Sequence, residues 1–581
     1  MQASTETSLS GKQNGVGMTL LRQPIIPFAL VLACLPLALV VTLVMPIGPM
    51  YWDHYIYLDA ANRIFDGQVP SVDFFAPVGG LGYYLFALWI KIFPNGPPLL
   101  LASWSLLTLT APLMALVIAD VQKRSVPLAY ALLLPFLLFS ILPFNTGDFY
   151  PYPGSDGFGV YNRQICQLLY VLAAGLVFVR GWKTLAAVTA LCMLGLLFIK
   201  VTGIAAGVVL CLMAFAAGRL PLRAAITSGL VFVAVIGLAE LSSGIVSAYA
   251  NDILSLVLLN DTSLIPRLLQ AASINFGVVL ACAFLCLALF LIETEFFEKA
   301  KAFAARPGFA AFGRFADQSL LWLAAFILAG LLFESQNTGS QAFIFLWPLL
   351  LAIMLETWER KGPSPAFAAV TLLALSAALP PAVIILQKSA RAWIGSANNT
   401  PLQSHNLKSL GAVSVRDLLN VRAERMRRSY IDDRSTYEAV AASGELPSFL
   451  LYSDFEFQSL WLQSADEAVS ALRTFETDHE MRFETIMTID FTNPFPWLMD
   501  RHAPKYIAIG ADPYRAVPPV NDEMNAAVAA VDVALYPTCP PTTARLQLLD
   551  LYEPALAATH RRIKLSPCYD AFVRNELLPK P

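Results

Sequence analysis

The sequence contains little charge. Asp, Glu, Lys and Arg make up 14% of its 581 residues, whereas soluble globular domains carry about 25%. Hydrophobic residues make up 57%, and the mean hydropathy is +0.59. We therefore expect most of the chain to lie in lipid. The net charge of −3 and the lack of a basic run give no indication of nucleic-acid binding.

Several motifs of soluble enzymes and metalloproteins are also missing. The eight cysteines form no CxxC motif and no cluster with histidines, which argues against a cysteine-based metal site. The polar last third has neither a glycine-rich phosphate loop nor a Ser-His-Asp signature. Its histidines are isolated, and isolated histidines are more often structural than catalytic. We therefore expect no chemistry in that part of the chain.

Apolar runs recur along the first two thirds of the chain. A helix needs about 20 apolar residues to cross a bilayer, and runs near this length lie at 25–47, 99–120, 126–142, 163–179, 184–199, 201–217, 224–246, 273–292, 318–333, 342–357 and 365–387. Basic residues favour the cytoplasm, and they gather in alternate loops if the N-terminus is inside. We predict a polytopic α-helical membrane protein with about eleven transmembrane helices. Its tail, 1–24, would be cytoplasmic, the first span would be an uncleaved anchor, and the C-terminus would lie outside.

The stretch 50–93 follows the first predicted span and combines acids with a helical pattern. Asp53 and His54 come first, an apolar periodicity typical of a helix follows, and Gly67 ends it shortly before Pro70. The aromatic run 82–93 is expected to lie along the membrane surface rather than to cross the membrane. Acids in such a place are costly without a use, so the stretch is a candidate site.

This pattern resembles the GT-C superfamily of membrane glycosyltransferases, which includes the protein O-mannosyltransferases and the lipid A aminoarabinose transferases. Asp53, Tyr57, Gly67 and Pro70 stand where that pattern has its residues. The chain departs from it at His54, where the superfamily usually has Glu, and at 76–78, where Ala-Pro-Val replaces Lys-Pro-Pro. The resemblance implies a GT-C-like fold for 25–387, with catalytic outer loops at 49–98 and 143–162. It also implies a polyprenyl phosphate sugar as the donor.

The resemblance further implies roles for individual acids. Asp53 would be the base that takes the proton of an acceptor hydroxyl. Alternatively, or in addition, it caps the helix that follows. A second acid is expected from 143–162, where Asp156 or Asp148 would support Asp53. Asp53 and Asp156 together could also bind a divalent cation, Mg²⁺ or Mn²⁺. In the alternative interpretation, Asp148 and Asp156 only form turns.

Basic residues at predicted outer helix ends are candidates for binding the donor phosphate. Lys200 joins two apolar runs with almost no loop between them, and Arg163 lies at another helix end. In GT-C transferases a basic residue meets the phosphate of the lipid carrier, and a lysine does so as a point charge. The alternative is that both side chains only extend toward the lipid headgroups.

Other polar residues at the predicted outer face are candidates for substrate binding. Ionisable groups near the end of a span, such as Glu240, usually face a cavity or a partner. The polar loop 334–341 offers amides to a sugar, or is simply a turn. The candidates are His54, Tyr57, Glu240, Gln336 and Asn337.

Residues 388–581 have a different composition. Short β-rich runs at 449–452, 485–489, 506–509 and 531–536 alternate with helical patterns at 464–475 and 522–531. This alternation predicts a soluble, extracytoplasmic α/β domain. Cys539 and Cys568 would then lie on the oxidising side, so we predict a disulfide between them. The remaining cysteines lie in or beside apolar runs, where they behave as small hydrophobic residues.

These features indicate an inverting glycosyltransferase of the bacterial inner membrane. It would transfer a hexosyl or pentosyl group, on the outer face, to a lipid, glycan or protein acceptor. Two alternatives remain open: a transporter or flippase of lipid-linked glycans, and a catalytically inactive GT-C-like scaffold. Transporters often contain inverted repeats, none is evident here, and the acids cluster on one side, which favours the enzyme. His54, at a position that is usually acidic, keeps the scaffold open.

Overall fold

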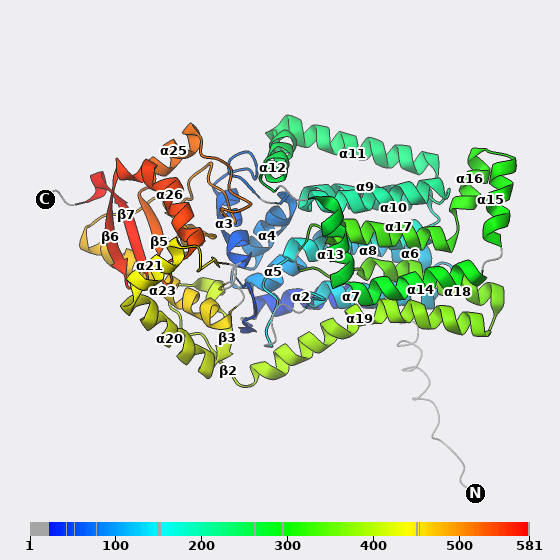
Figure 1. The fold of residues 1–581 in the computed structure, drawn as a ribbon, viewed down its shortest axis with the longest axis horizontal. Coiled ribbons are helices and arrows are strands. Elements are labelled where there is room, and N and C mark those ends of the chain that lie inside the picture. The colour runs from blue at the N-terminus through cyan, green and yellow to red at the C-terminus, as the bar shows by residue number, and fades with distance from the viewer. Residues whose placement is uncertain are drawn as a thin grey trace, which may run out of the picture.

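The structure is a computed structural model in which two parts lie end to end (Figure 1). It describes residues 23–578 except 42, 52, 77, 148–152, 261–262, 293–294, 338, 449–450 and 452–453. One part is a bundle of helices. The other, residues 397–578, mixes helices with strands, and we call it the C-terminal domain.

Each apolar run predicted from the sequence falls, at least in part, on helices of the bundle. The helices of this part are α2 (Ile25–Val40), α3 (Asp53–Phe65), α4 (Leu81–Ile92), α5 (Pro98–Trp104), α6 (Leu107–Val121), α7 (Val126–Ile141), α8 (Val160–Phe178), α9 (Trp182–Ile199), α10 (Val201–Ala216), α11 (Leu222–Ser243), α12 (Ile245–Leu259), α13 (Leu264–Ile274), α14 (Phe276–Ile292), α15 (Glu295–Ala305), α16 (Phe309–Ala316), α17 (Ser319–Glu334), α18 (Trp347–Lys361) and α19 (Pro365–Ser396). Nearly every residue of α8 is buried, so α8 is the central helix of the bundle.

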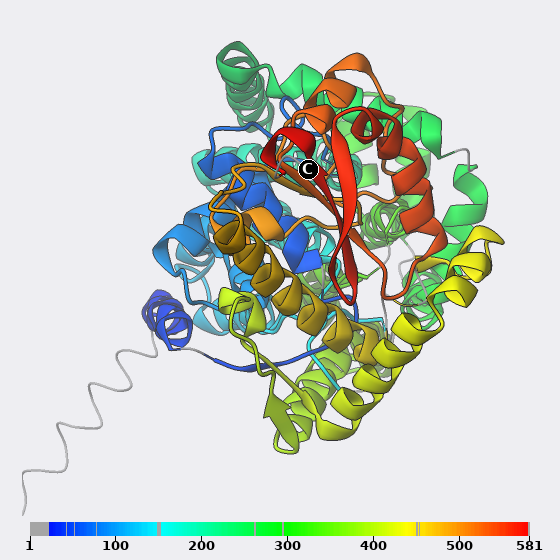
Figure 2. The ribbon, with the colours of Figure 1, turned by 90° about the vertical axis from the view of Figure 1, so that its left-hand side faces the viewer.

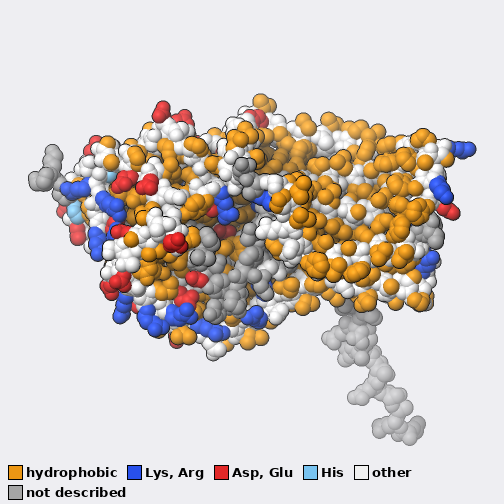
Figure 3. Space-filling view, in the orientation of Figure 1, with side chains coloured by type: hydrophobic (Ala, Val, Ile, Leu, Met, Phe, Trp, Pro, Cys, Tyr) orange, Lys and Arg blue, Asp and Glu red, His pale blue; other side chains and the backbone are white. Residues whose placement is uncertain are grey.

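Within the described residues, four helical segments are long and apolar enough to cross a membrane. They are α5–α6 taken together, α9, α11 and α19, and the bent pairs α13–α14 and α16–α17 raise the number to six if each pair is one span. Apolar side chains cover the bundle, whereas charged side chains gather on the C-terminal domain and at the far end of the bundle (Figure 3). The chain thus has the surface of a multi-pass membrane protein, and the count of about eleven spans stays a prediction.

Two helices near the candidate site are shorter than a span. α2 ends at Val40, and the residues after it form β1 (Met45–Pro46), which pairs in parallel with β3 (Val413–Arg416) of the C-terminal domain. The predicted span 25–47 is therefore too long, because its last residues extend toward Pro46 and Pro49, which cannot continue a helix without losing a hydrogen bond. α4 has 12 residues, so its length of about 18 Å is too short to cross a bilayer.

The C-terminal domain contains a four-stranded sheet in the order β4-β5-β7-β6. β4 (Ile486–Thr488) pairs in parallel with β5 (Val533–Pro537), whereas β7 (Tyr569–Arg574) pairs antiparallel with both β5 and β6 (His560–Ser566). β2 (Asn399–Pro401) joins β1 and β3 in a smaller sheet. Figure 2 faces this domain, with β6 and β7 in red. Its helices are α20 (Asp417–Asp432), α21 (Arg434–Ala442), α23 (Phe455–Asp478), α24 (Phe495–Met499), α25 (Asp522–Ala529) and α26 (Thr543–Ala557).

The boundaries in this domain differ in part from those expected. The boundary expected at residue 388 falls inside α19, which ends at Ser396. β4 and β5 lie on the expected runs 485–489 and 531–536, whereas 506–509 is not a strand, and Tyr506 there has a φ of +62°. The run 449–452 lies mostly outside the described residues. Cys539 and Cys568 form the expected disulfide.

The helix α3 belongs to both parts. Its N-terminal end meets the bundle, and its buried face packs on the C-terminal domain, where Tyr55 stacks on Trp461 of α23 with the ring centroids 4.4 Å apart. After α3, Gln68 donates a hydrogen bond to the carbonyl of Ala503 at 2.8 Å. The first residue of α3 is Asp53, so this packing fixes the position of the candidate base.

Candidate active site

Asp53 lies where α3, the loop before α8 and the C-terminal domain meet. Its Oδ2 accepts a hydrogen bond from the backbone N–H of Gly159 at 3.1 Å. Gly159 has a φ of +71°, and a Cβ there would lie 2.6 Å from the carbonyl oxygen of Gly339. Only glycine fits this conformation and this close approach without strain. The Gly159 N–H is therefore held in place to orient the Asp53 carboxylate.

The other acids of the stretch 50–93 have basic partners. Asp59 pairs with Arg63 at 2.9 Å in a fully buried contact. Asp66 lies 2.9 Å from the ring of His502, and Asp73 pairs with Lys505 at 2.9 Å. Among the described residues, Asp53 makes no ion pair and contacts only the Gly159 N–H through its carboxylate. Among the four acids of the stretch, Asp53 is therefore the one whose carboxylate has no basic partner within the described residues.

The surroundings of Asp53 suit a base. Burial raises the pKa of Asp53 to about 7, although the Gly159 N–H and the charges of Arg163 and Arg515 act in the opposite direction. A general base works best when its pKa is near the pH at which it operates. At neutral pH a large fraction of Asp53 is therefore deprotonated and basic enough to accept a proton.

Lys200 lies at the junction of α9 and α10. Its Nζ donates to Asn162 Oδ1 at 3.2 Å, to the carbonyl of Gln336 at 3.3 Å and to Asn337 Oδ1. It also lies 5.0 Å from the ring centroid of Tyr161. Burial raises the pKa of Tyr161, and the charge of Asp53 raises it further. Tyr161 is thus a neighbour of both the candidate base and the candidate phosphate-binding lysine.

The cluster around Lys200 has more positive than negative charge. Burial lowers the pKa of Lys200 to about 7, and the charge of Arg515 lowers it further, whereas Glu334 raises it. Arg267 of α13 donates to the Gln336 side chain at 2.5 Å and brings another cation to the same loop. Gln336 and Asn337, expected to bind a sugar or to form a turn, here accept hydrogen bonds from Lys200 and Arg267 and hold these basic side chains in position. The arrangement suits a bound anion.

Arg163 and Asp156 lie behind this cluster. The Arg163 side chain is 2% exposed and donates to Asn145 Oδ1 at 3.0 Å and to the carbonyl of Phe158 at 2.8 Å. Asp156 pairs with Lys388 of α19 at 2.6 Å and accepts from the Asn145 N–H at 2.7 Å. Neither side chain reaches Lys200 or Asp53 directly. Together they fix the loop that carries Phe158 and Gly159, and the Gly159 N–H donates to Asp53.

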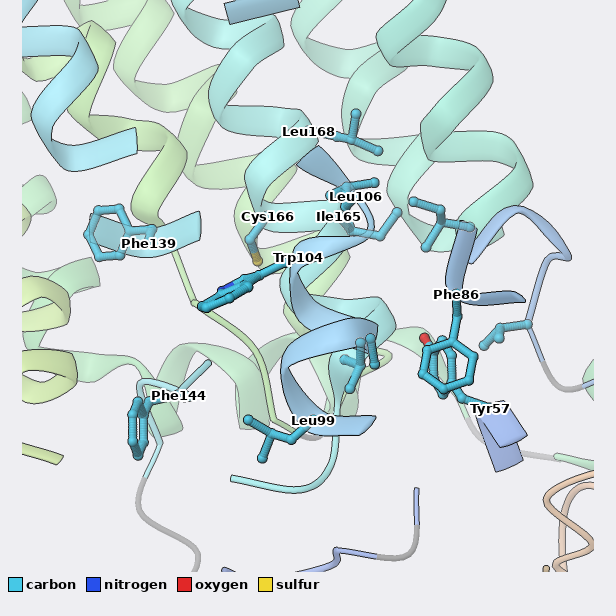
Figure 4. Close-up of a cluster of buried hydrophobic side chains, with 14 of the residues drawn as sticks. Tyr57, Phe86, Leu99, Trp104, Leu106, Phe139, Phe144, Ile165, Cys166 and Leu168 are labelled. Carbon is cyan, nitrogen blue, oxygen red and sulfur yellow. The ribbon is translucent and has the colours of Figure 1, made fainter. Parts of the chain in front are cut away.

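Tyr57 and His54 are buried on the inner side of α3. The Tyr57 ring lies 5.4 Å from Phe86 and 5.0 Å from Tyr83, and Figure 4 shows Tyr57 and Phe86 facing each other. Neither the Tyr57 hydroxyl nor either nitrogen of His54 has a hydrogen-bond partner among the described residues. Burial lowers the pKa of His54 to about 3, so its ring is neutral at physiological pH. The position that is usually acidic in GT-C enzymes therefore has no charge here.

Another predicted residue, Glu240, makes its contacts away from the site. Glu240 accepts hydrogen bonds from the N–H groups of Val246 and Ser247, both at 3.0 Å, and so stabilises the turn between α11 and α12. This contact gives Glu240 a local structural role in place of the predicted substrate contact. Asp148 lies outside the described residues.

The residues present do not fit a divalent cation shared by Asp53 and Asp156. Asp156 is already paired with the ammonium group of Lys388, and a cation would have to displace it. The described residues also contain no group of three or more His, Cys, Asp or Glu that could hold a metal ion. No step of the reaction proposed below therefore depends on a metal ion.

Several residues that the structure brings to this site carry no functional signal in the sequence. Gly159 and Asn162 come from the loop before α8 and its first turn, and Arg267 comes from α13. Gly159 contacts Asp53, which lies 106 positions away in the sequence. Only the glycine-rich composition of 154–159 could have indicated a close backbone approach.

Comparisons with known proteins give distant structural matches. No protein-family model and no curated protein matches the sequence. ArnT from Cupriavidus metallidurans, solved with bound undecaprenyl phosphate, has a TM-score of 0.40 and 13% identity, with 95% of this chain and 99% of that chain covered. The archaeal oligosaccharyltransferase AglB from Archaeoglobus fulgidus, solved with an inhibitory peptide and a dolichol phosphate, has a TM-score of 0.30 and 12% identity, with 98% and 75% covered.

These matched proteins are GT-C glycosyltransferases, the superfamily that the pattern around Asp53 resembles. Both proteins were solved with a polyprenyl-type phosphate lipid.

Proposed function

We propose that this protein is a membrane glycosyltransferase that moves a sugar from a polyprenyl phosphate donor to a hydroxyl acceptor. The observation that carries this proposal is the carboxylate of Asp53, which makes no ion pair among the described residues and shares the neighbour Tyr161 with Lys200. Asp53 alone among the acids of the stretch 50–93 lacks a basic partner within the described residues, and burial raises its pKa to about 7. A base and an anion-binding cation are the two groups that such a transfer needs.

In the proposed reaction, the acceptor oxygen attacks the anomeric carbon of the donor sugar. Asp53 takes the proton of the attacking hydroxyl as the new glycosidic bond forms. The bond between the anomeric carbon and the phosphate oxygen breaks, with inversion at that carbon. Its electron pair leaves with the polyprenyl phosphate, whose negative charge Lys200 and Arg267 stabilise. Proton loss from Asp53 to water then restores the base.

The surrounding residues have supporting roles in this proposal. Gln336 and Asn337 orient the basic side chains, and the buried Tyr57 hydroxyl has no hydrogen-bond partner among the described residues and would bind substrate only if substrate reached it. Asp156 supports Asp53 indirectly, because its ion pair with Lys388 fixes the loop that ends at Gly159. We assign the end of the bundle that meets the C-terminal domain to the outer face of a bacterial inner membrane, with the N-terminus in the cytoplasm. The acceptor is a lipid, glycan or protein that presents a hydroxyl.

Asp53→Asn tests the proposal. Asn keeps the shape of the side chain and can still accept from the Gly159 N–H, but it cannot take a proton at neutral pH. We expect expression and thermal stability to stay near those of the wild type. Release of polyprenyl phosphate in membranes that contain lipid-linked sugars should fall by about a hundredfold or more, the scale of a lost general base.

Asp66→Asn is the matched control, since Asp66 lies next to the other end of α3 and contacts His502. Equal activity of the two variants would remove Asp53 from the chemistry.

The wild-type assay with EDTA should retain full activity, because the ammonium group of Lys388 is already paired with the Asp156 carboxylate. Movement of the lipid-linked sugar across the membrane without release of polyprenyl phosphate would favour the flippase instead.

A further inference from the structure

A loop of the C-terminal domain reaches the candidate active site. The loop 510–521 precedes α25, and its Arg515 carbonyl accepts a hydrogen bond from the Asn260 side chain, next to the end of α12, at 3.2 Å. Leu256 of α12 also packs against the apolar cluster of the C-terminal domain that contains Val517. These contacts fix the backbone of Arg515 on the bundle.

The Arg515 side chain has hydrogen-bonding capacity to spare. Its Nε donates to Asp512 Oδ2 at 2.7 Å, and Asp512 in turn accepts from the N–H of Tyr514 at 3.0 Å. No other described residue accepts a hydrogen bond from the Arg515 guanidinium, and the side chain is 68% exposed. A guanidinium has five N–H donors, so the nitrogens that face away from Asp512 can bind a further anion.

The bundle segment that holds the Arg515 backbone continues into α13, whose Arg267 contacts Gln336, and the Gln336 carbonyl accepts from Lys200. The positive charge of Arg515 acts on Asp53, on Tyr161 and on Lys200. Lys200 and Arg515 are thus like charges that repel each other. The nearby acid Glu334 accepts a hydrogen bond from the Ser340 hydroxyl. An anion between Lys200 and Arg515 would relieve their repulsion, and the planar fork of an arginine fits a phosphate oxygen pair.

We propose that Arg515 binds the phosphate of the lipid-linked donor from the side opposite Lys200. The C-terminal domain then supplies a part of the donor site and covers it, and the bundle alone is incomplete. This inference rests on the proposed function, and it names the phosphoester anion as the ligand that the loop recognises. In the reaction above, Arg515 stabilises the charge of the leaving phosphate and Asp512 holds the guanidinium in place.

The first test measures binding of undecaprenyl phosphate to the full-length protein in nanodiscs. We expect Arg515→Ala to raise the Kd about tenfold or more, and Arg515→Lys to raise it less, because the charge is kept and the fork is lost. Asp512→Asn, which loosens the guanidinium without removing it, should fall between the wild type and Arg515→Ala. Arg561→Ala is the control, since Arg561 is an exposed arginine on β6, outside the site. It should bind as the wild type does.

The second test uses the pH profile of kcat/KM, which a structural role would not move. The Arg515 charge lowers the pKa values of Asp53 and Lys200, so its removal raises both. Asp53 must be deprotonated and Lys200 protonated, and both limbs of the profile should therefore shift to higher pH in Arg515→Ala. A profile that only loses height, together with an unchanged Kd, would overturn the role of Arg515. A wild-type protein that binds no undecaprenyl phosphate would instead overturn the proposed function.

Discussion

Four aspartates of the stretch 50–93 have the same chemistry and different surroundings. Asp59 is buried with Arg63, and Asp66 and Asp73 contact basic residues of the C-terminal domain. A carboxylate that is buried without a cation pays a desolvation penalty, and only Asp53 does so here. An unpaired charge of this kind is retained where its reactivity is used. The partners, rather than the acids themselves, separate the candidate base from the structural residues.

The pKa values of Asp53 and Lys200 predict a narrow pH optimum. Burial raises the pKa of Asp53 and lowers that of Lys200, each to about 7. Activity should rise with pH as Asp53 loses its proton and fall as Lys200 loses its own, so kcat/KM should form a bell with its maximum near pH 7. In Lys200→Arg the cation stays charged throughout, and the alkaline limb should disappear while the acid limb remains. An alkaline limb that persists unchanged in this variant would exclude Lys200 as its source.

Single residues could be predicted from the sequence only where the motif or the helix ends marked them. Asp53 follows the first apolar run, and Lys200, Gln336 and Asn337 lie between apolar runs, so all four were found. Arg163 also lies at such a helix end, yet three hydrogen bonds bury it behind the site. Arg515 lies in a domain that has no catalytic motif, and only the fold brings it beside Asp53. Burial and contacts between distant segments are not visible in a sequence read without a structure.

At the scale of elements, α3 is held on the C-terminal domain by a buried arginine. Arg63 is fully buried and donates to Asp59 at 2.9 Å, to Gln68 at 3.3 Å and to the carbonyl of Pro504. Its guanidinium also lies 5.2 Å from the ring centroid of Phe74. Since α3 begins with Asp53, this network links the C-terminal domain to the position of the candidate base.

Arg63→Met should destabilise the protein strongly. Removal of one member of a buried ion pair leaves the other uncompensated and costs about 3–5 kcal/mol. The double variant Asp59→Asn/Arg63→Met leaves no unpaired charge and should unfold at a higher temperature than the single variant. Thermal unfolding of the purified protein measures both. Arg428→Met is the control, because the Arg428–Glu424 pair is exposed and such pairs contribute about 0–1 kcal/mol. Similar losses for Arg63→Met and Arg428→Met would refute this role of Arg63.

Elements with a strong hydropathy signal were predictable, and those set by tertiary pairing were not. The apolar runs fall for the most part on helices, because lipid leaves the backbone few other ways to satisfy its hydrogen bonds. The hairpin of β6 and β7 was not predicted, since basic residues on β6 mask the apolar alternation of a strand. β1 was assigned to the first span because its pairing with β3 joins residues more than 350 positions apart. Such a pairing leaves no local pattern.

At the scale of the whole molecule, polarity divides the chain into an apolar bundle and a charged domain (Figure 3). Composition alone indicated this division, although it placed the boundary inside α19. The proposed function needs the C-terminal domain on the outer side, where the lipid-linked donor is used. Cysteine oxidation reports this orientation independently of activity, because thiols in the bacterial cytoplasm are kept reduced.

Cys539 and Cys568 should therefore be oxidised in protein taken from native membranes. The two residues are bonded and lie 29 positions apart, and closing a loop of that length stabilises the domain by about 3–4 kcal/mol in the chain-entropy model. Alkylation followed by non-reducing mass spectrometry should find this pair linked. Cys282 and Cys286 of α14 are free thiols and serve as an internal control that should be alkylated after unfolding. The variant Cys539→Ser/Cys568→Ser should unfold at a lower temperature, with the bundle helices still intact by circular dichroism. Free thiols at both positions in the native membrane would place the C-terminal domain in the cytoplasm, and with it the cluster of Asp53, Lys200 and Arg515.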